Sequence, residues 1–138
     1  KMNSYSMINL LIVGLLVAVV VYVIGCRNND KLIVSGIYSV NSGSGKYGII
    51  KILVLDSNVV HIRIYANKFD NRPSQLDTSK LFLGTIHDKE FGVGHMPIAI
   101  SELLQWEPRL IMKQSITQEE LEGYNIWKED NGGVFGKP

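Results

Sequence analysis

The longest apolar stretch of the chain lies near its N-terminus. Residues 10–24 carry no charged side chain, and extending the stretch to residues 8–25 adds a single polar side chain, that of Asn9. As a helix, residues 8–25 would be about 27 Å long, close to the ~30 Å hydrocarbon core of a bilayer. A helix in a protein core would show polar positions with a period of 3.6, which residues 10–24 lack. The pattern predicts a membrane segment over residues 1–26.

The residues that follow this segment bear on its type and orientation. We expect an uncleaved, single-pass helix, and the alternative is a bacterial lipoprotein signal, in which Cys26 is lipidated after the preceding residues are removed. Arg27 and Lys31 follow the apolar stretch, so the positive-inside rule favours a cytoplasmic C-terminal domain. A lipoprotein or a periplasm-facing domain is the alternative location. Residues 27–30 are predicted to be a short polar linker.

Beyond the linker, runs rich in β-branched and aromatic residues predict short strands. The runs are residues 31–40, 47–55, 59–65, 81–86 and 109–113. The second and third runs flank a three-residue polar loop, which predicts a β-hairpin.

Two short helices are predicted later in the chain. Ser101 is a suitable N-cap for a helix that Pro108 ends. Thr117 and Glu120 have the spacing of a capping box, which predicts a second helix over residues 118–128.

Together these elements predict one small β-rich α+β domain over residues 31–130. We expect an SH3-like partial barrel or a bent antiparallel sheet with two short helices. The glycine-rich end, residues 131–138, is predicted to be a flexible tail.

Composition excludes several classes of function. The chain has 138 residues with 14 Lys+Arg and 13 Asp+Glu, a net charge of +1, which argues against a nucleic-acid-binding domain. Its single cysteine excludes an internal disulfide and any site built from several cysteines. The three histidines lack the spacing of zinc motifs, and we expect no metal or other cofactor.

The predicted hairpin places two cations next to each other. With the loop at residues 56–58, Lys51 lies opposite Arg63 and Leu53 opposite His61. Alternation predicts one apolar face for the core and a second face for partner contacts. The second face carries Lys51, Leu53, His61, Arg63 and Tyr65. Paired cations favour an acidic partner, a phosphate or an anionic lipid headgroup, and the alternative is that carboxylates elsewhere in the domain neutralise them.

A second candidate site lies in the segment 91–97. Two glycines around Val93, followed by His95 and Pro97, predict an unusual backbone path. With Trp106 nearby in the sequence, this segment could form an aromatic-rimmed groove for a peptide, and the alternative is a plain connecting loop.

The sequence therefore predicts a non-enzymatic, membrane-tethered, bacterial domain that binds another protein. One alternative is an immunity or accessory protein that neutralises a toxin at the membrane. Another is a small hydrolase that uses the loop from His87 to His95. The candidate binding residues are Lys51, His61, Arg63, Tyr65, His95 and Trp106.

Overall fold

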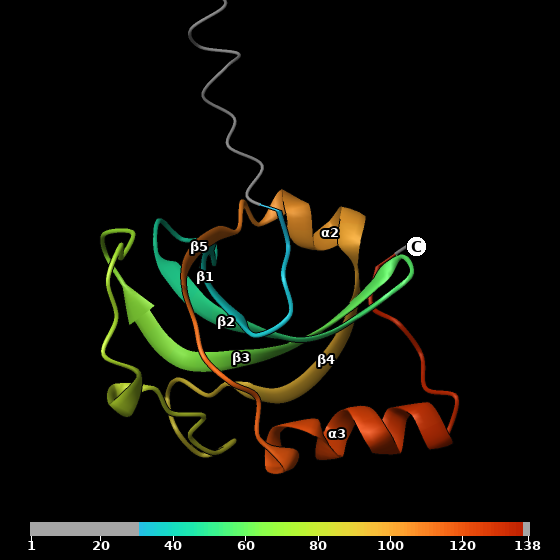
Figure 1. Ribbon diagram of the computed structural model, residues 1–138. Coiled ribbons are helices and arrows are strands. Elements are labelled where there is room, and N and C mark those ends of the chain that lie inside the picture. The colour runs from blue at the N-terminus through green and yellow to red at the C-terminus, as the bar shows by residue number, and fades with distance from the viewer. Residues whose placement is uncertain (1–30, 137–138) are drawn as a thin grey trace, which may run out of the picture.

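The computed structural model describes residues 31–136, which form a small α+β domain (Figure 1). Five strands build one antiparallel sheet in the order β4-β3-β2-β1-β5. The strands are β1 (Gly36–Asn41), β2 (Tyr47–Asp56), β3 (Val59–Phe69), β4 (Val93–Ala99) and β5 (Arg109–Lys113). The helices are the short 3-10 helix η1 (Thr78–Lys80) and the α-helices α2 (Ile100–Gln105) and α3 (Gln118–Glu129). The prediction of a small α+β domain with an antiparallel sheet and two α-helices is confirmed.

The predicted hairpin is formed by β2 and β3. Lys51 lies opposite Arg63, as expected. The register shifts between Ile52 and Val54, so that His61 lies opposite Val54. The predicted pairing of His61 with Leu53 is wrong, because an irregularity in the ladder displaces the end of the hairpin by one residue.

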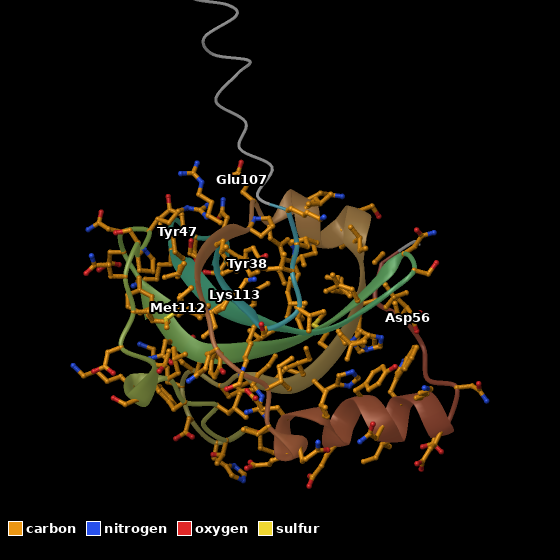
Figure 2. The ribbon with its side chains drawn as sticks, in the orientation of Figure 1. Tyr38, Tyr47, Asp56, Glu107, Met112 and Lys113 are labelled. Carbon is orange, nitrogen blue, oxygen red and sulfur yellow. The ribbon has the colours of Figure 1, made fainter. Side chains whose placement is uncertain are left out.

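The face predicted to be apolar forms the main core of the domain. The sheet curves around this face, and α2 lies across one end of the curve (Figure 1). Tyr38 lies in the enclosed space (Figure 2), where its hydroxyl accepts a hydrogen bond from the Ile33 N–H and donates one to the Lys31 carbonyl. The buried residues of this cluster are Tyr38, Val40, Ile50, Ile52, Val60, Ile62, Ile98 and Leu103.

The opposite face of the sheet is also covered. One part packs Ile37, Ile49 and Tyr65 against partly buried residues of the segment 69–83 and of β5. The other part lies under α3, which runs along the outer side of the sheet (Figure 1). Lys51 and His61, expected on a face that meets a partner or solvent, are 1% and 0% exposed.

The fourth strand is not where the sequence predicts it. Residues 81–86 form no strand, and their backbone contacts include bonds from the Ala66 N–H to the Phe82 carbonyl and from the Gly92 N–H to the Leu83 carbonyl. The strand beside β3 is β4, which contains most of the predicted connecting loop. Pro97 is compatible with this position because β4 lies at an edge of the sheet.

The two α-helices begin differently. Ala99 is the N-cap of α2 and its side chain makes no capping hydrogen bond, so the prediction of Ser101 as N-cap is wrong. The capping box of Thr117 and Glu120 at the start of α3 is confirmed.

The C-terminal segment is attached to the domain. The Phe135 N–H donates to the Pro97 carbonyl, and the Phe135 carbonyl accepts from the Ala99 N–H. Phe135, which lies within the predicted tail, is therefore paired with β4.

Within residues 31–136, no helix is long and apolar enough to cross a bilayer. The predicted membrane segment, Cys26 and the linker over residues 27–30 lie outside the described residues.

Candidate functional site

A buried ion pair joins α3 to the sheet. Lys51 Nζ lies 2.9 and 2.8 Å from the two carboxylate oxygens of Glu120, and it also donates to the Ser115 carbonyl at 2.8 Å. Arg63 Nη1 lies 3.8 Å from Glu120 Oε1. Glu120 is the buried residue of α3. The two cations that face each other across the hairpin thus meet a carboxylate of their own chain.

The surroundings of Glu120 keep it ionised. Burial raises the pKa of this carboxyl, but the hydrogen bonds from Lys51 and the Thr117 N–H, with the charges of Lys51 and Arg63, outweigh burial and lower the pKa below its usual value. Glu120 Oε2 accepts from both Lys51 and the Thr117 N–H, so the same carboxylate forms the ion pair and caps α3.

Tyr65 borders this ion pair. Burial raises the pKa of its hydroxyl, and the charge of Glu120 raises it further, whereas the charge of Arg63 and a hydrogen bond with Arg63 lower it. The phenol therefore remains neutral at pH 7 and belongs to the apolar cluster on this face.

Two histidines stack beneath the C-terminal half of α3. His61 Nδ1 lies 2.9 Å from His95 Nε2, and the rings are 8° from parallel. Tyr124 and Trp127 meet the His61 ring edge-on, at centroid distances of 4.7 and 4.5 Å. Among the described residues, the buried His61 Nε2 has no hydrogen-bond partner. The pair is enclosed by aromatic rings.

Burial keeps this histidine pair neutral. It lowers the pKa of His61 to about 4, with a further lowering from the charge of His95 and a small opposing effect of Asp56. Burial also lowers the pKa of His95. At pH 7 the two rings therefore share a hydrogen bond between neutral imidazoles.

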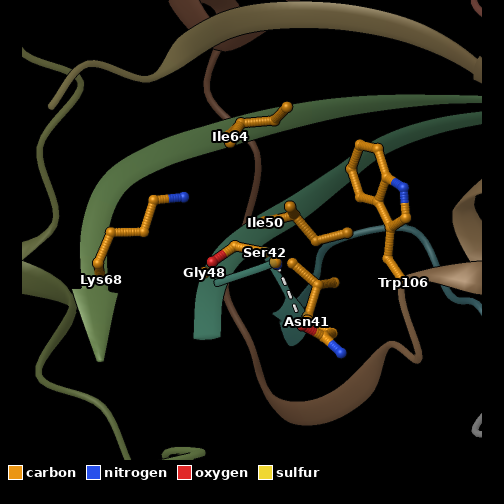
Figure 3. Close-up of a pocket in the computed structure, with 9 residues that line it drawn as sticks. Asn41, Ser42, Gly48, Ile50, Ile64, Lys68 and Trp106 are labelled. Atoms are coloured by element: carbon orange, nitrogen blue, oxygen red, sulfur yellow. Dashed lines mark hydrogen bonds between the residues drawn. The ribbon is translucent and has the colours of Figure 1, made fainter. Parts of the chain in front are cut away.

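A cavity of about 430 Å³ opens on the other side of the sheet, beside Trp106 (Figure 3). Its walls come from the end of β1 and the turn after it, from β2 and β3, and from the residue that follows α2. They are Val40, Asn41, Ser42, Gly43, Gly48, Ile50, Ile64, Lys68 and Trp106. The Lys68 ammonium group points across the opening toward Ile50 and Ile64 (Figure 3).

An exposed apolar loop leads into β4 and includes its first residue, Val93. We use the name apolar loop for residues 82–93. The bond from the Gly92 N–H to the Leu83 carbonyl closes it at 2.6 Å. Exposed fractions are 51% for Phe82, 78% for Ile86, 53% for Phe91 and 37% for Val93. Exposure of several large apolar side chains in one segment is typical of an interaction surface.

The structure divides the predicted site residues among three places. Lys51, Arg63 and Tyr65 lie around Glu120, and His61 and His95 lie side by side under α3. Trp106 lines the cavity and packs against the main core. His95 contacts His61 and Tyr124, whereas Trp106 packs against the main core, so the two residues lie in different clusters.

Sequence reasoning missed several members of these sites, among them Glu120 and Lys68. Glu120 was identified as a capping residue, but the pair of cations across the hairpin also signalled a need for a carboxylate. Lys68 lies beyond the predicted end of the third strand, and only the longer β3 brings it beside the cavity.

The described residues hold no group of three or more His, Cys, Asp or Glu side chains arranged to bind a metal ion. Comparison with known protein families, curated proteins and solved structures finds no match to this chain. The function is therefore argued from the geometry alone.

Proposed function

We propose that this chain is a non-enzymatic, membrane-tethered bacterial domain that binds another protein through the apolar loop. The observation that carries the proposal is the exposure of Phe82, Ile86, Phe91 and Val93 on one segment. Exposed apolar side chains gain free energy when a partner removes them from water.

The apolar loop is held in place before any partner arrives. Phe82 is fixed to β3, because its N–H donates to Asn67 Oδ1 and its carbonyl accepts from the Ala66 N–H. Near the tip, Asp88 Oδ2 accepts from the Thr85 N–H at 2.6 Å and from the Thr85 hydroxyl at 2.9 Å. A preorganised loop loses less conformational entropy on binding.

The paired cations are less suited to the partner contact. Lys51 is buried and already bound to Glu120, and Arg63 lies beside the same carboxylate. An acidic partner would have to displace α3 to reach Lys51, whose side chain is 1% exposed. We therefore assign the contact to the apolar loop.

A photo-crosslinking amino acid placed at position 91 of the full chain tests this assignment in native membranes. We expect a discrete product with a second protein, and we expect Ile86→Asp to reduce its yield by about tenfold, since one central apolar residue can dominate an interface. Ile126→Asp is the matched control, because Ile126 is 60% exposed but lies on α3.

Two results would contradict the proposal. One is the absence of any product with a second protein from position 91. The other is an equal loss of product in the Ile86→Asp and Ile126→Asp variants, which would indicate a general effect of added charge.

The other predicted functions gain no specific support. A toxin-neutralising or accessory role would use the same protein-binding surface. A hydrolase would need His87 and His95 together, yet His87 is exposed whereas His95 stacks on His61 beneath α3. Both functions stay predictions.

Within the α+β class, we also propose that the curved sheet is an SH3-like partial barrel. The last strand, β5, follows the short helix α2 and returns to pair antiparallel with β1. This order of pairing supports the proposal.

A further inference from the structure

Lys68 differs from the other cations at its end of the sheet. Lys46 pairs with Asp70 at 2.9 Å. Arg72 lies over the ring of Tyr47 and donates to the Glu107 carbonyl at 2.8 Å. Within residues 31–136, Lys68 forms no ion pair. It lies beside the cavity that Trp106 lines.

A glycine makes room for the Lys68 side chain at this position. Gly48 lies directly opposite Lys68 in the ladder of β2 and β3. A Cβ atom on Gly48 would lie 3.3 Å from Lys68 Nζ, 3.5 Å from Ser42 Cβ and 3.7 Å from Val40 Cγ2. Because Gly48 has no side chain, the Lys68 ammonium group can turn inward over the cavity (Figure 3).

The remaining walls are suited to an apolar body. Ile64 and Trp106 contribute partly buried side chains, Val40 and Ile50 lie buried behind them, and no lining residue carries a carboxylate. The volume of about 430 Å³ is in the usual range for sites that bind small molecules.

The backbone around the cavity offers few partners to an extended peptide. β1, β2 and β3 each pair with a neighbour on both sides. The turn next to the cavity uses its own groups, since the Ser42 N–H donates to the Lys46 carbonyl and Asn41 Oδ1 accepts from the Gly43 N–H. The walls therefore favour a ligand whose polar part is one anionic group.

We propose that this cavity binds a small amphiphile that has one carboxylate head and an apolar body. Lys68 binds the carboxylate, while Ile64 and Trp106 contact the apolar body. This site is separate from the apolar loop, so the inference does not depend on the protein-binding proposal.

The full chain in lipid nanodiscs, titrated with 3-phenylpropanoate and with its uncharged amide, tests the inference by NMR. We expect the acid to bind about fivefold more tightly than the amide, the gain that a partly exposed ion pair supplies. The shifted signals should come from residues that line the cavity. The same titration with a Gly-Gly-Phe peptide, once with a free and once with an amidated C-terminus, tests whether the carboxylate at the end of a peptide chain binds as the free acid does.

Two variants separate charge from shape. Lys68→Gln should remove the preference for the acid, whereas Lys80→Gln, at a side chain 81% exposed and outside the cavity lining, should preserve it. Gly48→Ala should weaken the acid and the amide alike, because the added methyl group enters the cavity. Equal affinity for acid and amide in the unaltered chain, an undiminished preference in Lys68→Gln, or no binding of either compound would overturn the inference.

Discussion

Gly123 marks the closest approach of α3 to the sheet. A Cβ atom at this position would lie 2.5 Å from His95 Cβ and 3.0 Å from His95 Cγ. Alanine raises helix propensity by about 1 kcal/mol, but here helix and strand would have to move apart, at a cost of about 1–3 kcal/mol. We predict that Gly123→Ala lowers the thermal unfolding midpoint. Gly133→Ala, which meets no atom within 4 Å, should leave the midpoint nearly unchanged, and equal effects would contradict the account of α3 packing.

The ion pair of Lys51 and Glu120 is a second prediction at the scale of residues. Lys51→Met leaves the buried Glu120 carboxylate without its main partner, which costs about 3–5 kcal/mol of unfolding free energy. Glu120→Gln keeps a side-chain acceptor for the Thr117 N–H, so Lys51→Met combined with Glu120→Gln should recover part of the loss. Urea unfolding of the two single variants and the double variant measures the coupling. Additive losses would show that the pair is not coupled.

The sequence predicts Lys51 opposite Arg63, but the turn is one residue shorter than predicted, because Asp56 already pairs with Val59, and the register shift between Ile52 and Val54 restores this pairing. The sequence does not identify the carboxylate that meets the two cations. Glu120 is 69 residues from Lys51, and the first turn of a helix is ordinarily a solvated position for an acidic residue. The partner depends on which helix covers which face, and that is decided by the packing of the whole domain.

At the scale of elements, the choice of the fourth strand could not be made from hydrophobic pattern. Residues 81–86 and the segment that forms β4 are both short and apolar with internal glycine. Backbone contacts decide between them, since a Cβ on Gly92 would overlap the Ile64 carbonyl of β3. Gly92, which suggested a loop, allows the chain to approach β3 immediately before β4 begins.

The prediction of α3 succeeded for a different reason. Its capping box is a local pattern, in which Thr117 and Glu120 satisfy backbone groups three residues away. Such a pattern can be recognised without knowledge of the tertiary context, although the equally local N-cap signal at Ser101 was wrong. The attachment of α3 through Glu120, Gly123 and the aromatic contacts with His61 is not local, and the sequence did not indicate it.

At the scale of the whole molecule, alternation identifies two faces of the sheet but does not show that both are covered. The core predicted from Ile50, Ile52, Val60 and Ile62 is confirmed. The opposite face is polar in sequence, yet its cations meet Glu120 of α3 and His61 meets His95 beneath the same helix. Charged and titratable side chains therefore occupy an interface in which pH affects the stability of the fold.

The effect of pH on stability has a definite sign. The pKa of His61 falls from its usual 6.5 to about 4 in the folded domain, chiefly through burial. Between these values the unfolded chain binds a proton at this position and the folded domain does not, so acid favours unfolding. The contribution of neutral His61 to the stability of the folded domain is complete above about pH 6.5 and declines as the pH falls toward 4. The lowered pKa of Glu120 adds a loss in the same direction at lower pH.

We predict that the free energy of unfolding, measured with urea at pH 7.5, 6, 5 and 4, decreases most steeply below about pH 6.5. His61→Phe should flatten the decrease between pH 6.5 and 4, because the aromatic surroundings accept an apolar ring that binds no proton. His87→Gln, at an exposed position of the apolar loop, should retain the slope of the unaltered chain. An unchanged slope in His61→Phe would mean that the proton uptake which destabilises the fold occurs at other groups.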